Sequence, residues 1–127
     1  MSWTLLLNQI TTVSRVKIRM NTKLATSLAE AISSLSQEDL AVFHAALLQS
    51  MISKTLGVAG GYACIRNTRI AIWTLISLFQ QGATEAELLL DFPGLTAFDL
   101  WIAQTYYRAN RAEIDEAIVF HNEETIE

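Results

Sequence analysis

The sequence predicts a mainly α-helical protein in which an N-terminal helical hairpin is followed by a helix-turn-helix unit, with a short extended or β-ribbon segment between them. Three observations support this fold class. Apolar residues recur at three- and four-residue spacing through most of the chain, as on one face of an amphipathic helix. This spacing breaks down where Gly57, Gly60 and Gly61 gather. In the second half, a carboxylate follows a Thr or Asn by three positions at three places, which predicts a capping box at each helix start. The three pairs are Thr84 with Glu87, Thr96 with Asp99, and Asn110 with Glu113.

Residues 1–20 differ in pattern from the rest of the chain. The segment "RVKIRM", residues 15–20, alternates apolar and basic residues like an edge strand, but no nearby segment offers it a partner. A helix start follows directly, with Asn21 or Thr22 as its N-cap. We therefore predict a disordered or extended N-terminal extension over residues 1–20 and suggest Met20 as the start of the natural protein.

The predicted hairpin occupies residues 21–55. Its first helix, residues 22–35, has a continuous apolar face. Ser36 is expected to begin the second helix, because its hydroxyl can accept a hydrogen bond from the amide of Asp39. That second helix, residues 37–54, has a wide apolar face, which favours an antiparallel pair.

The predicted helix-turn-helix domain occupies residues 56–127. The stretch "YACI" is short enough to be one strand of a small ribbon. Helices are expected after it over residues 70–80, 85–92, 97–109 and 111–124. The short helix and the longer helix on either side of the Pro-Gly turn have the outline of a helix-turn-helix, and the helix before them, which ends at Gly82, would support them.

Charge is divided unevenly along the chain, whose net charge is −4. Residues 1–69 hold seven Lys and Arg against three Asp and Glu, whereas residues 70–127 hold two against ten. The acidic half is either an ordinary solvated surface or a face for a basic partner, and both interpretations stay open. Because 51% of the residues are hydrophobic, we also expect an apolar interface with a second copy, formed through the hairpin.

Composition limits the chemistry as well. No apolar run approaches the roughly 18 residues of a membrane-spanning helix. The only cysteine, Cys64, cannot form an internal disulfide, so a reduced, cytoplasmic protein is predicted. His44 and His121 lie on different predicted helices without neighbouring ligand residues, and we therefore expect neither a metal nor a cofactor. The glycines lack the spacing of a phosphate loop, and no catalytic set is recognisable, so no enzymatic activity is predicted.

Two arginines flank the turn that precedes the first helix of the domain. We expect Arg69 to be structural, with its guanidinium paired to Asp91 or Asp99, because such a fork satisfies several acceptors at once. Arg66 should then be the more exposed of the two, and is the candidate for contacting a phosphate or a partner protein.

A series of motifs across residues 57–118 resembles the domain-of-unknown-function family 433, a group of small bacterial proteins. The matching positions are Gly60, Gly61, Ile65, Thr68, Arg69, Ile70, Gly82, Thr84, Glu87, Asp91, Phe92, Pro93, Leu95, Thr96 and Asp99. Asn67 occupies the place of the glycine in the family's Gly-Thr-Arg-Ile motif. Because asparagine tolerates a positive φ better than other side chains, we expect Asn67 to preserve the turn.

The resemblance implies a homeodomain-like helix-turn-helix unit with an antitoxin role. Residues 21–54 also resemble the N-terminal arm of many cyanobacterial members. Proteins of this kind are proposed as antitoxins encoded beside a PIN-like nuclease toxin. Such antitoxins typically bind the toxin and repress their own promoter. A DNA-binding regulator without a toxin partner is the alternative.

The predicted contact residues follow from these two roles. For operator DNA they are Arg66, Thr96, Ala97, Asp99, Gln104, Arg108 and Arg111. The excess of carboxylates after residue 70 argues against strong phosphate binding. An acidic C-terminal helix is better suited to cover the basic surface of a nuclease. The predicted partner-binding residues are Glu113, Asp115, Glu116, Glu123 and Glu124.

Overall fold

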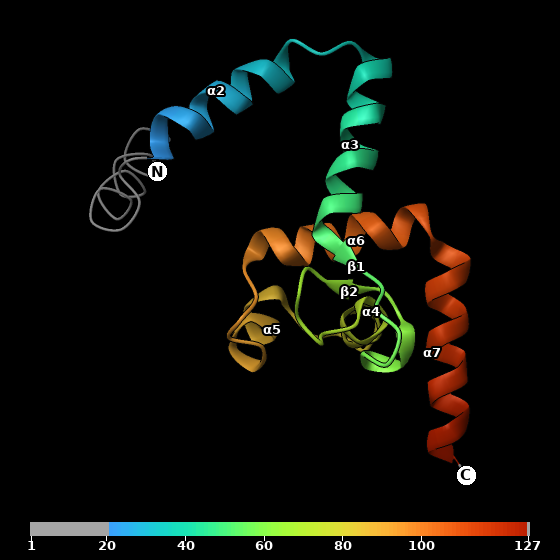
Figure 1. Ribbon diagram of the computed structural model, residues 1–127. Coiled ribbons are helices and arrows are strands. Elements are labelled where there is room, and N and C mark those ends of the chain that lie inside the picture. The colour runs from blue at the N-terminus through green and yellow to red at the C-terminus, as the bar shows by residue number, and fades with distance from the viewer. Residues whose placement is uncertain (1–20, 127) are drawn as a thin grey trace. The chain divides into compact units, whose positions relative to one another are not determined.

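The computed structural model describes residues 21–126, with side chains up to Glu123, and is mainly helical (Figure 1). Its elements are α2 (Thr22–Ser33), α3 (Gln37–Met51), β1 (Ile52–Ser53), the 3-10 helix η2 (Ala59–Gly61), β2 (Cys64–Ile65), α4 (Ile72–Gln80), α5 (Glu85–Asp91), α6 (Ala97–Ala109) and α7 (Arg111–Ile126). They form two compact units, one ending at Phe43 and the other beginning at His44. The predicted N-terminal extension and the suggested start at Met20 lie outside the described residues.

The first helix of the predicted hairpin forms as α2, and the second forms as α3. The second helix is shorter than predicted, because α3 ends at Met51 and the next two residues, Ile52–Ser53, form the strand β1. The hydroxyl of Ser36 accepts a hydrogen bond from the amide of Asp39 at 3.1 Å, which caps the start of α3. Neither α2 nor α3 buries a side chain, so the predicted packed hairpin is not confirmed. Near the C-terminal end of α3, Leu47, Leu48 and Met51 belong to the second unit and pack against its core.

A two-stranded antiparallel ribbon follows α3, as the stretch "YACI" predicts. β1 pairs with β2 so that Ile52 faces Ile65 and Ser53 faces Cys64. The backbone continues this pairing beyond Ile52 and Ile65, because the amide of Arg66 donates to the carbonyl of Met51 at 2.7 Å. The ribbon therefore fixes the end of α3 to the turn that carries the two arginines.

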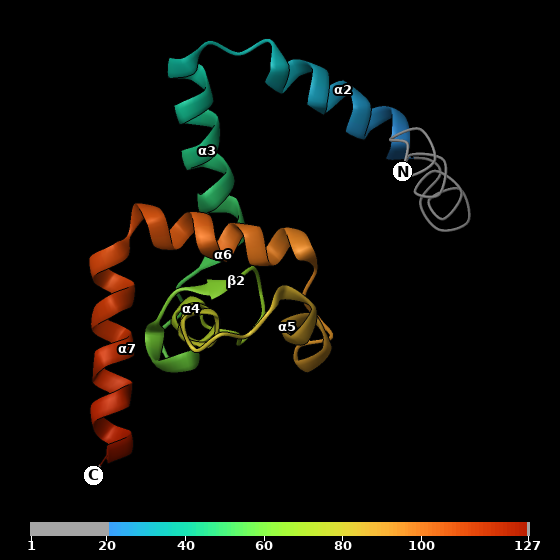
Figure 2. The same ribbon diagram turned by 180° about the vertical axis from the view of Figure 1, so that it is seen from behind.

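The core of the second unit lies among α4, α5, α6 and α7. In Figures 1 and 2, α6 spans this unit, and α5 and α7 lie on opposite sides of α4. The most deeply buried side chains are Ile65, Ile72, Leu75, Leu88, Leu100 and Ile102, with further apolar residues from α7. Burial of this apolar cluster is the main source of stability of the unit, because each Å² of apolar surface removed from water contributes about 25 cal/mol.

The ends of these helices are set by local sequence signals. Thr84 with Glu87, and Thr96 with Asp99, form the two predicted capping boxes that begin α5 and α6. α4 ends at Gln80 and is followed by Gly82, which has a φ of +102°, and the amide of Ala83 donates to the carbonyl of Leu78 at 3.0 Å. This is the Schellman arrangement that glycine favours.

The predicted capping box at the start of α7 is wrong. The side-chain amide of Asn110 donates to the carbonyl of Tyr106 at 3.0 Å, back toward α6. The carboxylate of Glu113 accepts hydrogen bonds from Tyr106 and Lys54 instead of the Asn110 amide. Asn110 is the only residue between α6 and α7. Its backbone and side-chain N–H groups cap the C-terminal end of α6, and its side chain does not cap the start of α7.

Candidate functional site

Arg66 and Asp99 form a two-pronged ion pair between the turn after β2 and the first turn of α6. Nε of Arg66 lies 2.9 Å from Oδ1 of Asp99, and Nη2 lies 2.5 Å from Oδ2. Asp99 is only 1% exposed, whereas the side chain of Arg66 is 39% exposed. The pKa of Asp99 is held below its usual value, mainly by the hydrogen bonds from Arg66, and burial acts in the opposite direction.

This pair corrects the assignment of the two arginines. Asp99 was expected to pair with Arg69, but it pairs with Arg66, and Arg69 is exposed. Asp91 is exposed as well, and among the described residues it forms no ion pair with either arginine. The buried carboxylate of Asp99 is also a poor candidate for a DNA contact, because its oxygens are occupied by Arg66 and by the amide of Thr96.

The turn that separates the arginines has a different conformation from the one expected. Arg66, with a φ of +44°, has the left-handed conformation that was predicted for Asn67. Thr68 closes the turn: its amide and its hydroxyl both donate to the carbonyl of Ile65, at 2.9 and 2.6 Å. The hydroxyl of Ser53 donates to the carbonyl of Arg66. These bonds hold Arg66 in the conformation that directs its guanidinium to α6.

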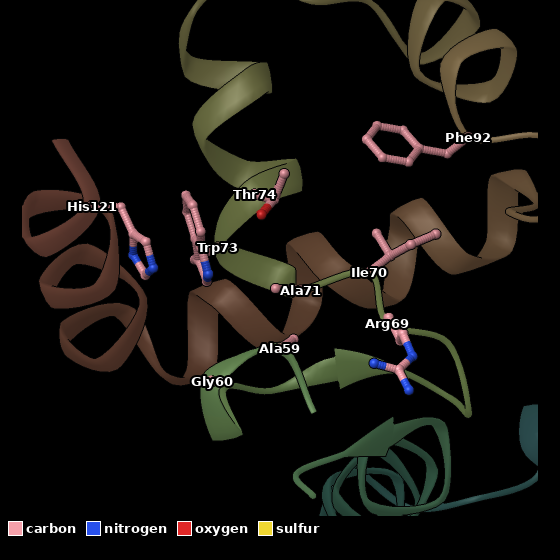
Figure 3. A pocket seen from close by; sticks show the side chains of 9 residues that line it. All are labelled: Ala59, Gly60, Arg69, Ile70, Ala71, Trp73, Thr74, Phe92 and His121. Atoms are coloured by element: carbon pink, nitrogen blue, oxygen red, sulfur yellow. The ribbon is translucent and has the colours of Figure 1, made fainter. Parts of the chain in front are cut away.

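Arg69 borders a pocket of about 330 Å³ beside the start of α4. The remaining lining residues are Ala59, Gly60, Ile70, Ala71, Trp73, Thr74, Phe92 and His121. The rings of Trp73 and His121 are stacked, with centroids 3.9 Å apart and an interplanar angle of 14°. Figure 3 shows these two rings facing each other, with Ile70 and Phe92 on the opposite side of Trp73 in that view.

The predicted DNA-contacting residues do not all gather on one surface. Gln104, Arg108 and Arg111 line one groove of about 430 Å³ between α4 and α6, with Ile76 and Phe79 among its walls. Thr96 and Ala97 are exposed at the other end of α6 and do not line this groove.

The predicted partner-binding carboxylates divide into two kinds. Glu113 and Asp115 have internal roles, because Glu113 accepts from Tyr106 and Asp115 accepts from the hydroxyl of Tyr107 at 2.8 Å. The half-buried Asp115 also borders a shallow surface of about 380 Å³, whose other lining residues are the exposed Glu116, Val119, Phe120 and Glu123; we call this surface the α7 face. The side chain of Glu124 lies outside the described residues.

Lys54, Tyr106 and Glu113 form a polar cluster that sequence reasoning missed. Nζ of Lys54 lies 2.9 Å from the Glu113 carboxylate, and the Tyr106 hydroxyl donates to the same carboxylate at 2.9 Å. Burial, followed by the bond to Glu113, raises the pKa of Tyr106. No local pattern links Lys54 to a residue 59 positions away, so the sequence gives no signal for this cluster.

The described residues offer no obvious place for catalysis by a metal. They contain no group of three His, Cys, Asp or Glu side chains that can hold an ion. His44 packs edge-on against Trp101, and His121 contacts Trp73, Tyr62 and Phe120. Cys64 is buried in the core, and burial raises the pKa of its thiol. Among the described helices, none has the length and apolar character needed to cross a membrane.

Comparisons with known proteins identify the family. Residues 52–107 match the family described as "Protein of unknown function (DUF433)". The crystal structure of a DUF433 member protein from Anabaena variabilis is 49% identical to this chain, with a TM-score of 0.54. The match covers 79% of this chain and 99% of that one. No curated protein matches the chain. Together, the match in sequence and the similarity to a solved member show that this chain belongs to the DUF433 family.

Proposed function

We propose that this protein is a non-enzymatic, antitoxin-like protein that binds and neutralises a PIN-like nuclease toxin in the cytoplasm. It would act as a homodimer and repress its own promoter through a helix-turn-helix unit formed by α5 and α6. The antitoxin role comes from the family resemblance in the sequence. The structural observation that supports this role is the α7 face, where carboxylates lie beside exposed apolar side chains.

The composition of the α7 face suits a basic protein partner. Val119 is 53% exposed and Phe120 is 51% exposed, so this helix presents apolar area to solvent. Glu116 and Glu123 are exposed on the same helix and line the same surface. An apolar centre with a charged rim is the usual composition of a protein interface. Because nucleases that bind RNA present positive surfaces, the carboxylates favour this class of partner.

Binding of operator DNA has a separate basis. Arg108 and Arg111 are the only Lys or Arg residues after residue 70, and both line the groove between α4 and α6. Gln104, from the same groove, can donate to and accept from a base edge. This placement favours the alternative function, a DNA-binding regulator without a toxin partner.

A growth-rescue experiment tests the antitoxin role. The proposal predicts that a PIN-like nuclease is encoded beside this gene. That nuclease is expressed with the wild-type chain or with one of two double variants. Glu116→Arg/Phe120→Ser changes the α7 face. Glu85→Arg/Leu90→Ser is the matched control, because it also replaces an exposed carboxylate and an exposed large apolar residue, here on α5.

The expected outcome is rescue of growth and co-purification of the nuclease with the wild-type chain and the α5 control, but not with the α7 variant. Failure of the wild-type chain to rescue would overturn the antitoxin role. If both variants rescued growth equally, the antitoxin role would stand, but the α7 face would be excluded as the surface that binds the nuclease. Salt-dependent binding of upstream DNA, weakened by Arg108→Gln and seen without any nuclease contact, would support the alternative function.

A further inference from the structure

Residues that mark the family resemblance come together at a pocket that the proposed function does not use. Gly60, Arg69, Ile70 and Phe92 belong to three separate motifs, and all four line the pocket of about 330 Å³ beside α4. Gly60 has a φ of +69°. A Cβ atom at that position would lie 3.1 Å from the Tyr62 ring, which leaves little room for a side chain. None of these four residues takes part in the ion pairs among the described residues, and all four contribute to the wall of this pocket.

The walls of the pocket are suited to a flat apolar group. Trp73 is only partly buried, and His121 stacks on one face of its indole. Ile70 and Phe92 lie on the opposite side of Trp73 in Figure 3, where they supply aliphatic and aromatic surface. Aromatic rings favour stacked or edge-to-face neighbours, so a ring that enters here gains contacts beyond simple burial.

Arg69 gives the pocket one fixed positive charge. Its guanidinium is exposed, and none of the ion pairs among the described residues uses it. In Figure 3 it projects from the loop that leads into α4. No other Lys or Arg lines this pocket, and no carboxylate lines it either. A guanidinium without a competing acid binds a carboxylate through two parallel hydrogen bonds.

We propose that this pocket binds a small aromatic carboxylate, with its ring against Trp73 and its carboxylate on the Arg69 guanidinium. The volume lies near the lower end of the roughly 300 to 1,000 Å³ typical of ligand pockets, which fits one ring system with a short acidic side chain. A nucleoside di- or triphosphate carries several negative charges, and a single fixed cation does not match them. This inference is independent of the antitoxin role.

The test uses indole-3-acetate as the probe and its uncharged amide, indole-3-acetamide, as the matched ligand. Binding is followed by NMR through the indole N–H signal of Trp73, which is assigned with a Trp73→Phe variant. Wild-type protein, Arg69→Gln and Arg108→Gln are titrated in parallel. Arg108→Gln is the control because it removes an exposed arginine that lines a different groove.

The expected result is a saturable shift of the Trp73 signal with the acid, and affinity that is about tenfold weaker for the amide or in Arg69→Gln. Arg108→Gln should bind the acid like the wild type. No saturable Trp73 shift at about 10 mM acid would overturn the proposal, as would equal affinity for acid and amide. An equal loss of affinity in Arg108→Gln would show general charge attraction instead of a site, and would also overturn it.

Discussion

Arg66 donates two hydrogen bonds to Asp99 across 33 positions of sequence, and the same carboxylate accepts the amide of Thr96 at 2.9 Å. The Asp99 carboxylate therefore takes part both in the N-terminal cap of α6 and in the ion pair with Arg66. The pair joins the turn after β2 to the start of α6. Because a buried carboxylate needs all of its partners, the loss of either residue leaves charge or hydrogen-bonding capacity unsatisfied.

Replacement of Arg66 should destabilise the protein much more than replacement of Arg69. Arg66→Ala is expected to lower the free energy of unfolding by about 2 kcal/mol, because it strands the Asp99 carboxylate. Arg69→Ala, at an exposed position, should change it by less than about 0.5 kcal/mol. Arg66→Gly should cost about 1 kcal/mol less than Arg66→Ala, since glycine tolerates the positive φ. Urea denaturation measures all three, and equal losses for the two alanine variants would contradict the assignment.

Stability should fall in acid through Asp99. Its pKa in the folded state is depressed, so its contribution is fully present above the unfolded pKa of about 3.9 and is lost as pH falls through the folded pKa. We expect the difference in unfolding free energy between the wild type and Asp99→Asn to be large at pH 7 and to narrow below about pH 4. Urea titrations at several pH values check this, and a difference that does not vary with pH would be inconsistent with the ion pair.

A comparison of Gly82→Ala with Gly94→Ala tests whether the positive φ of Gly82 is needed at the end of α4. Gly82→Ala should destabilise the protein by about 1 kcal/mol, because its φ of +102° disfavours any side chain. Gly94→Ala should be neutral or slightly stabilising, since Gly94 does not have a positive φ and a Cβ there meets no atom within 4 Å. Thermal unfolding compares the two variants, and a similar decrease in Tm for both would argue against a conformational cause.

Removal of the Tyr106 hydroxyl should lower the free energy of unfolding more than removal of the Lys54 charge. Tyr106→Phe removes a part-buried hydrogen bond to Glu113 and is expected to cost about 1 to 2 kcal/mol. Lys54→Gln removes an exposed ion pair and should cost less than about 1 kcal/mol. Chemical denaturation at low and high salt distinguishes them, because only the lysine effect should shrink with salt. A larger cost for the lysine variant would reverse this ranking.

Local features of the fold were well predicted from the sequence. The bounds of α6, the capping boxes at Thr84 and Thr96, and the helix end at Gly82 all agree with the structure. Each of these depends on residues only a few positions apart, so the physical cause and its sequence signal lie in the same window. The short ribbon strand was recognised for the same reason.

Long-range pairing was not predictable in this way. Arg66 and Arg69 are chemically identical, and the choice between them depends on a positive φ at Arg66 that no glycine or asparagine marks. The partnership of Lys54 with Glu113 depends on how β1 and α7 meet. The apolar periodicity of α2 identifies a face but does not show what covers it, and no residue of α2 is buried.

The uninterrupted passage from α3 into β1 limits where this chain can be cut or grafted. A fragment that begins at residue 56 would lose the strand opposite Cys64 and Ile65 and the carbonyl that accepts the Arg66 amide. It would also lack Leu47 and Leu48, which pack against the core. Such a fragment exposes an unpaired strand edge, which invites aggregation. A fusion junction or truncation that preserves the unit therefore has to lie at or before His44.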